Sequence, residues 1–173
     1  MLKKYFLEKI VKISPEAPVR DSLIETANSL SNVVTSRIKR KESGNILLIG
    51  PPGCGKSFVI QRAICQASDQ VGHIEERNIS GTIDLKNISS ALKFEFDSDA
   101  PEVVILEGLV SLSQHERWLY GLLEEARKHH KLIIATSTKL DALDSLEKRI
   151  RSRFASSGLI IRNLIVMIEF ISS

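Results

Sequence analysis

The sequence predicts an α/β fold, a three-layer αβα sandwich with helices on both faces of a mostly parallel sheet. Three observations lead to this prediction. Short apolar segments that suit buried strands alternate along the chain with longer segments of helical periodicity. A glycine-rich turn joins one of these strands directly to a helix, as in βαβ units. The length of 173 residues favours one domain over two.

The composition is that of a globular protein with no membrane partner. Apolar residues make up 43% and charged residues 26% of the chain, close to the averages for soluble domains. The net charge of +3 is too small to predict nucleic-acid binding by itself. Residues 1–13 lack the uninterrupted apolar run of a signal peptide, and the longest apolar run, 164–168, is far shorter than the ~20 residues that span a bilayer. We interpret Cys54 and Cys65 as free thiols in a reducing compartment.

The N-terminal part is predicted to be helical. Residues 1–13 have apolar residues at helical spacing, and two prolines break the pattern at 14–18. Residues 19–38 then trace one apolar face of a long helix, which should end near residues 43–44. We therefore divide the chain into an N-terminal helical segment (1–43), a nucleotide-binding core (44–163) and a short apolar tail (164–173).

The core is predicted to alternate strands and helices. Short apolar runs predict strands at 45–49, 102–106, 132–135 and 158–162, with a weaker strand at 75–80. Helical patterns predict helices from 56 to about 67, at 82–94 and at 143–153, and residues 97–101 form a turn. A further helix should begin after Ser113, which with Glu116 makes a capping box.

A phosphate-binding loop follows the strand at 45–49. Gly50, Gly55, Lys56 and Ser57 meet the pattern G-x-x-x-x-G-K-[ST], which occurs by chance in roughly one such chain in two hundred. The glycines let successive N–H groups point at phosphate oxygens, Lys56 brings a positive charge, and Ser57 offers a hydroxyl to Mg²⁺. The predicted ligands are ATP and Mg²⁺, and the fold is of the P-loop NTPase type. The predicted nucleotide contacts are Gly50, Pro51, Pro52, Gly53, Cys54, Gly55, Lys56, Ser57 and Phe58.

An acidic residue ends the strand at 102–106, where P-loop NTPases hold Mg²⁺. Glu107 is therefore the predicted second magnesium ligand. The next position, where a second carboxylate would polarise the attacking water, is Gly108. General-base help is typically worth 10²–10⁴ in rate, so we expect ATP to be bound far better than it is hydrolysed. Thr138 is included among the nucleotide contacts near the γ-phosphate, although the pattern does not distinguish it from Thr136 and Ser137.

Together with the segment 146–154 (LEKRIRSRF), these features resemble the core of AAA+ ATPases. More narrowly, residues 45–57, 119–123 and 140–154 are similar to the subunit 4 family of the eukaryotic origin recognition complex. The resemblance spans about residues 30 to 163, and 146–154 is its most specific part. It implies an ATP-binding subunit that acts in the initiation of DNA replication in the nucleus. The implied partners are the other subunits of that complex, especially subunit 1, and DNA through the assembled complex.

The resemblance also implies a role for two arginines. In AAA+ assemblies, an arginine at the position of Arg153 reaches the γ-phosphate of a neighbouring subunit's ATP. Arg149 lies one helical turn earlier, so both guanidinium groups are expected on one side of the helix. An arginine supplied in trans is worth 10³–10⁵ in rate. Read without the family, the same residues are a solvated basic helix face.

Two departures from the family keep alternatives open. The family has Asp-Glu where this sequence has Glu107-Gly108, which puts hydrolysis in doubt but not binding. The family's helical lid and winged-helix domain are not expected within these 173 residues. The alternatives are an active ATPase of another AAA+ branch, such as a loader or chaperone, a small P-loop kinase, and an interaction module that has lost its nucleotide. The four histidines lack partners at metal-ligand spacing and do not predict a zinc site.

Overall fold

The computed structural model describes residues 21–71, 73–78, 102–109, 116–139, 141–157 and 160–161. Their order along the chain begins with helix α2, strand β1, helix α3 and strand β2, and continues with β3, α5, β4, α6 and β5. The bounds are α2 Asp21–Arg40, β1 Gly44–Ile49, α3 Lys56–Ala67, β2 His73–Asn78, β3 Glu102–Glu107, α5 Glu116–Lys128, β4 Leu132–Ser137, α6 Lys148–Ser157 and β5 Ile160–Ile161.

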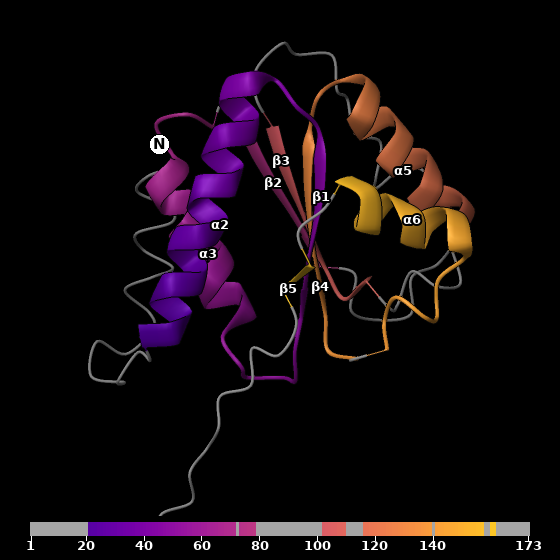
Figure 1. Cartoon of the computed structure of the whole chain (residues 1–173), viewed down its shortest axis with the longest axis horizontal. Coiled ribbons are helices and arrows are strands. Elements are labelled where there is room, and N and C mark those ends of the chain that lie inside the picture. Colours follow the sequence, from indigo (N-terminus) through magenta and orange to yellow (C-terminus); the bar gives the residue numbers. More distant parts are fainter. Residues whose placement is uncertain are drawn as a thin grey trace, which may run out of the picture.

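The described strands form one sheet with the order β2-β3-β4-β1-β5. Every pair of neighbouring strands in it is parallel. Helices α2 and α3 cover one face of the sheet, and α5 and α6 cover the other (Figure 1). This arrangement confirms the predicted three-layer αβα sandwich. Because the strands are parallel, the carboxyl ends of β1, β3 and β4 lie at the same edge, where ligands bind in open α/β sheets.

The two faces of the sheet bury two separate apolar cores. Along β1, Ile46 and Leu48 pack toward α2 and α3, whereas Leu47 and Ile49 pack toward α5 and α6. Strand side chains alternate between the faces of a sheet, so a strand covered on both sides must be apolar throughout. This explains why the predicted strands are uninterrupted apolar runs. All of the residues in β1 and β4 are buried.

Some boundaries differ from the sequence prediction. Strand β4 continues to Ser137 because it stays paired with β1 along its whole length, so Thr136 and Ser137 lie inside the strand. Helix α6 begins at Lys148 instead of 143, because the residues from Asp141 to Leu146 form hydrogen-bonded turns. The carboxylate of Glu116 accepts a hydrogen bond of 2.7 Å from the Glu147 N–H just before α6. Strand β2 begins at His73 and β5 at Ile160.

Several predictions lie outside the described residues. These are the helices at 1–13 and 82–94, the turn at 97–101, the N-cap Ser113 and the tail at 164–173. The division into segments 1–43, 44–163 and 164–173 therefore stays a prediction. Among the helices of the described ranges, none combines the length and apolar character that a membrane span needs.

Candidate nucleotide-binding site

The glycine-rich loop connects β1 to α3 at the carboxyl edge of the sheet. Gly53 has a φ of +77° and Gly55, the N-cap of α3, a φ of +97°, which are conformations that side chains disfavour. Gly55 makes no side-chain hydrogen bond that would cap the N-terminus of α3. The first N–H groups of a helix have no partner within it and carry the positive end of the helix dipole. This loop therefore has the local geometry of an anion site.

Lys56 turns its ammonium group back over the loop. The Nζ atom lies 2.7 Å from the carbonyl oxygen of Gly50, 2.9 Å from that of Pro51 and 3.6 Å from Sγ of Cys54. The positive charge is thus held at the predicted phosphate cradle. Cys54 itself is buried, with 3% of its surface exposed, and belongs to the core under α3.

Ser57 and Glu107 meet beside the loop although 50 residues separate them. Ser57 Oγ donates a hydrogen bond of 3.0 Å to Glu107 Oε1, and the two residues line a small hollow with Gln61, Ile60 and Ile105. A hydroxyl and a carboxylate are oxygen ligands of the kind that Mg²⁺ takes, together with phosphates and water. The described residues contain no group of three or more His, Cys, Asp or Glu that would hold a metal alone. The pair therefore fits a nucleotide-bound Mg²⁺.

Gly108 follows Glu107 directly after the end of β3. Gly108 has a φ of +87°, and its N–H donates a hydrogen bond of 3.3 Å to Thr136 Oγ1. Thr136 and Ser137 are both buried within β4, and the Ser137 hydroxyl interacts with the backbone of Lys139. Thr138 follows the strand and is exposed.

The remaining residues predicted to contact the nucleotide differ in how exposed they are. Pro51, Pro52 and Gly53 are exposed, as a loop that receives a ligand must be. Phe58 is different, because its half-buried side chain packs against the core between α2, α3 and the sheet. Only the backbone of Phe58, in the first turn of α3, remains for a phosphate contact.

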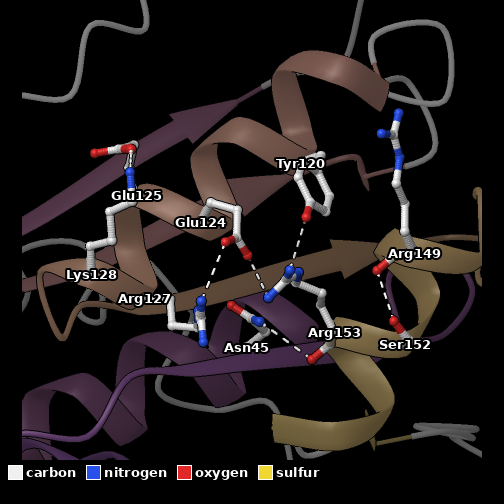
Figure 2. Close-up of polar contacts among 9 residues, drawn as sticks. All are labelled: Asn45, Tyr120, Glu124, Glu125, Arg127, Lys128, Arg149, Ser152 and Arg153. Atoms are coloured by element: carbon white, nitrogen blue, oxygen red, sulfur yellow. Dashed lines mark hydrogen bonds and ion pairs between the residues drawn. The ribbon is translucent and has the colours of Figure 1, made fainter.

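On the opposite face of the sheet, Arg153 of α6 lies against α5 (Figure 2). Its Nη1 atom is ion-paired with Glu124 Oε1, and its Nη2 donates a hydrogen bond of 3.0 Å to the Tyr120 hydroxyl. The guanidinium carbon lies 5.0 Å from the centroid of the Tyr120 ring. Arg153 and Glu124 have only 25% and 20% of their side-chain surfaces exposed.

Arg149, one turn earlier on α6, contacts the same aromatic ring. Its guanidinium carbon lies 4.9 Å from the Tyr120 centroid, and its Nε is ion-paired with Glu147. It is more exposed than Arg153, at 53% of its side chain. The structure thus brings the two predicted arginines together over Tyr120.

Arg153 lies far from the loop of its own chain. Its carbonyl oxygen accepts a hydrogen bond of 3.4 Å from Nδ2 of Asn45, which is the second residue of β1. Gly50 lies beyond the other end of that strand, and five residues of strand span about 16 Å. α6 also covers the face opposite to α3 (Figure 1). Arg153 therefore lies away from the phosphate loop of its own chain.

Sequence reasoning missed Glu124 and Asn45, and it noted Tyr120 only as part of a similar segment. Tyr120 and Glu124 are four residues apart on α5, so they share one face of the helix (Figure 2). That spacing was the available signal. It could not show that α6, more than twenty residues later, supplies the arginine between them.

Basic residues at the ends of α2 and α5 lie close together. Arg37 and Lys41 at the end of α2 and Arg127, Lys128 and His130 at the end of α5 line one hollow, with Glu42 and Ser43. A residue of positive φ follows each helix, Lys41 after α2 and His130 after α5, at the position where glycine is usual. Basic residues at helix C-termini complement the helix dipole. That role accounts for the cluster without a ligand.

Comparison with known proteins gives a consistent result. The family model described as "ATPase family associated with various cellular activities (AAA)" matches residues 46–160. The sequence is 26% identical to origin recognition complex subunit 4 of Schizosaccharomyces pombe over an alignment of 164 residues, which covers 66% of this chain. The alignment covers only 17% of that relative. The chain therefore spans a small part of the curated protein that it matches.

Solved structures of an Orc1 protein and of DnaA share the fold. The Aeropyrum pernix Orc1 protein in complex with DNA superposes with a TM-score of 0.66 at 14% identity, over 86% of this chain and 47% of that one. AMPPCP-bound DnaA from Aquifex aeolicus gives a TM-score of 0.55 at 20% identity, over 78% of this chain and 46% of that one. At these identities the likeness establishes the fold alone.

Proposed function

We propose, given that this chain belongs to the AAA family of ATPases, that it is an ATP-binding subunit of an origin recognition complex and offers Arg153 to the ATP site of a neighbouring subunit. The family is established by the match of the AAA model, and the proposed role is supported by the 26% identity to origin recognition complex subunit 4. The role proposed for Arg153 rests on one observation, the separation of Arg153 from the phosphate loop of its own chain. The loop lies at the carboxyl edge of the sheet, and Arg153 lies on the far face, near the start of β1.

ATP would be held by the loop from Gly50 to Ser57. The N–H groups of the loop and of the first turn of α3 would face the phosphates, and Lys56 Nζ would exchange its contacts with Gly50 and Pro51 for phosphate oxygens. Ser57 and Glu107, already 3.0 Å apart, would hold Mg²⁺, which neutralises charge on the β- and γ-phosphates. Thr138, exposed after β4, is the proposed contact near the γ-phosphate.

Hydrolysis by this chain alone is proposed to be weak or absent. Gly108 has no side chain that could orient a water molecule, and its N–H already contacts Thr136. General-base assistance typically contributes 10²–10⁴ in rate, so the loss of that group favours binding over turnover. The role of the site is then to stabilise an assembled state when ATP is bound.

Arg153 is proposed to act on the ATP of the neighbour, with Arg149 beside it. In the origin recognition complex that neighbour would be subunit 1. DNA would be contacted through the assembled complex, and the nucleus is the proposed location. This part rests on the relation to the yeast subunit, of which the chain spans 17%.

Two alternatives remain distinct from this proposal. An active AAA+ ATPase of another branch would need a water-activating acid, and the described part of the site has Gly108 at that position. A small P-loop kinase would transfer the γ-phosphate to an acceptor and would not depend on Arg153. Turnover measurements on the purified chain, with and without phosphate acceptors, separate both from the leading proposal.

The proposal is tested by reconstitution with subunit 1 and the remaining subunits, using wild type, Arg153→Ala or Arg151→Ala. Arg151 is the matched control, because it lies on the same helix and pairs only loosely with the exposed Asp144, at 3.4 Å. The Arg153→Ala variant should lower ATP turnover of the complex about 10³-fold or more. Arg151→Ala should stay within about twofold, in line with the small worth of exposed pairs. Equal turnover in wild type and Arg153→Ala would reject the proposed role in trans.

A further inference from the structure

We propose that Glu124 is a positioning residue for Arg153, which acts as an arginine finger if it reaches the ATP of a neighbouring subunit. The carboxylate of Glu124 fixes the guanidinium group of Arg153 on the ring of Tyr120. This inference rests on the proposed function of Arg153 and goes beyond it, because it assigns a role to an acidic residue of a different helix. The starting point is the burial of the pair. Glu124 is 20% exposed and Arg153 25%, so their ion pair is partly shielded from solvent.

The head group of Arg153 is held from two directions. Glu124 Oε1 pairs with Nη1, and the Tyr120 hydroxyl accepts from Nη2 at 3.0 Å. The ring below the guanidinium adds a cation–π contact at 5.0 Å. A guanidinium group is planar, so contacts to two of its nitrogen atoms fix its plane as well as its position.

The backbone of Arg153 is held by a third element. Its carbonyl oxygen accepts from Asn45 Nδ2 at 3.4 Å, and the neighbouring residue Phe154 is fully buried in the core under α6. The side chain thus begins at a fixed backbone position on α6 and ends at fixed partners on α5 (Figure 2). An arginine in solvent has several free torsions, whereas this one is already ordered before a partner arrives. Preorganised charge is the form in which electrostatic catalysis is most effective.

Glu124 has a second, more distant partner, which does not replace its ion pair with Arg153. Arg127 Nη2 lies 3.5 Å from Glu124 Oε2, and Arg127 is 63% exposed. The two oxygens of Glu124 therefore face different arginines, and the buried one is Arg153. The adjacent acid, Glu125, is 47% exposed and pairs instead with Lys128. Glu125 thus provides a control of the same residue type one position away.

The experiment uses the complex reconstituted with this chain as wild type, Glu124→Gln, Glu124→Asp, Glu125→Gln or Arg153→Ala, and measures kcat and KM for ATP. Glu124→Gln should lower kcat about ten- to a hundredfold, the range that one charge-assisted hydrogen bond carries, with KM unchanged. Glu124→Asp should lie between Glu124→Gln and wild type because it restores the charge. Glu125→Gln should match wild type within about twofold.

A second measurement does not depend on turnover. In the ¹⁵N-arginine-labelled chain alone, the Nε–Hε signal of Arg153, assigned by its loss in Arg153→Ala, should lie away from the solvent-exposed arginines. It should move toward them in Glu124→Gln and stay in place in Glu125→Gln. Circular dichroism establishes that each variant is folded, and Glu124→Asp provides the comparison if Glu124→Gln is not.

The outcomes separate the two proposals. If Arg153→Ala leaves turnover unchanged, the finger itself is rejected, and Glu124 has nothing to position. If Arg153→Ala abolishes turnover while Glu124→Gln equals wild type, only the inference about Glu124 is rejected. A faster rate in Glu124→Gln also overturns the inference, because it would mean that Glu124 withholds Arg153 from the neighbour.

Discussion

The phosphate loop and the arginine pair present charge in opposite ways. In the loop, the close partners of Lys56 among the described residues are carbonyl oxygens and a thiol, none of which is an anion that would neutralise it. Across the sheet, Arg153 is paired with a carboxylate and makes a cation–π contact with an aromatic ring. The first arrangement suits a site that waits for a charged ligand. The second holds the guanidinium group in one orientation, as its proposed action on the ATP of a neighbouring subunit would need.

The two regions also depend on the backbone to different degrees. The loop has left-handed conformations at Gly53 and Gly55, so its shape is determined by the backbone. The arginine site is built from ordinary helices whose side chains converge, and its precision comes from side-chain pairing. Substitutions at glycine should therefore disturb the loop and leave the arginine site unchanged.

The largest effect in this comparison is expected from Gly55→Ala. The new Cβ would meet Leu23 Cδ1 at 2.9 Å, and a φ of +97° is unfavourable for alanine. We expect a loss of about 1–3 kcal/mol in the free energy of unfolding, because a left-handed residue alone costs ~1–2 kcal/mol. Urea unfolding measures the loss, and ATP affinity should fall with it.

Gly121→Ala is the matched control on α5. Nothing lies within 4 Å of the Cβ that it would add, and the residue is exposed in a helix next to Tyr120. Alanine is the better helix former by roughly 0.5–1 kcal/mol, so this variant should be stabilised. Equal stability of the Gly55→Ala and Gly121→Ala variants would contradict the contrast between the two regions.

The smallest effect is expected at the exposed pair of Glu125 and Lys128. The hydrogen bond from Lys128 lowers the pKa of Glu125 below its ordinary 4.5, and the same bond raises the pKa of Lys128 above 10.5. Both pKa shifts favour the folded state between these two values. As pH falls through the lowered pKa of Glu125, that contribution is lost, and the lysine's is lost as pH rises through its raised pKa.

Urea unfolding of wild type and Glu125→Gln from pH 3 to 7 checks this expectation. Wild type should be slightly the more stable at pH 7, and the difference should vanish at low pH or in 0.5 M salt, because exposed charges are screened. A difference that grows on acidification would contradict the assigned direction of the pKa of Glu125.

The sequence was sufficient for the loop because its determinants are contiguous. Eight residues define the turn, and two of its glycines, Gly53 and Gly55, have positive φ. The strand and the helix on either side are predicted from local periodicity. The alternation of apolar strands and helices likewise predicted the layers. Boundaries were less predictable. The turns at 141–146 depend on local hydrogen bonds, which periodicity does not reveal.

The arginine site was not predictable from the residues alone. Asn45, Tyr120, Glu124 and Arg153 come from three elements spread over 108 residues, and only the packing of α6 beside α5 brings them together. The resemblance to AAA+ proteins identified Arg149 and Arg153 as functional candidates. It did not identify Glu124, whose partner becomes apparent only when the two helices are placed.

The central claim is that the loop from Gly50 to Ser57 binds the phosphates of ATP, and a titration of ATP with Mg²⁺ into the purified chain tests it most directly. Lys56→Ala is compared with wild type and with Lys41→Ala, which removes an exposed lysine at the end of α2. We predict that Lys56→Ala weakens ATP binding about ten- to a hundredfold, as expected for one charged contact, and that Lys41→Ala does not. Equal affinity of wild type and Lys56→Ala would contradict the account.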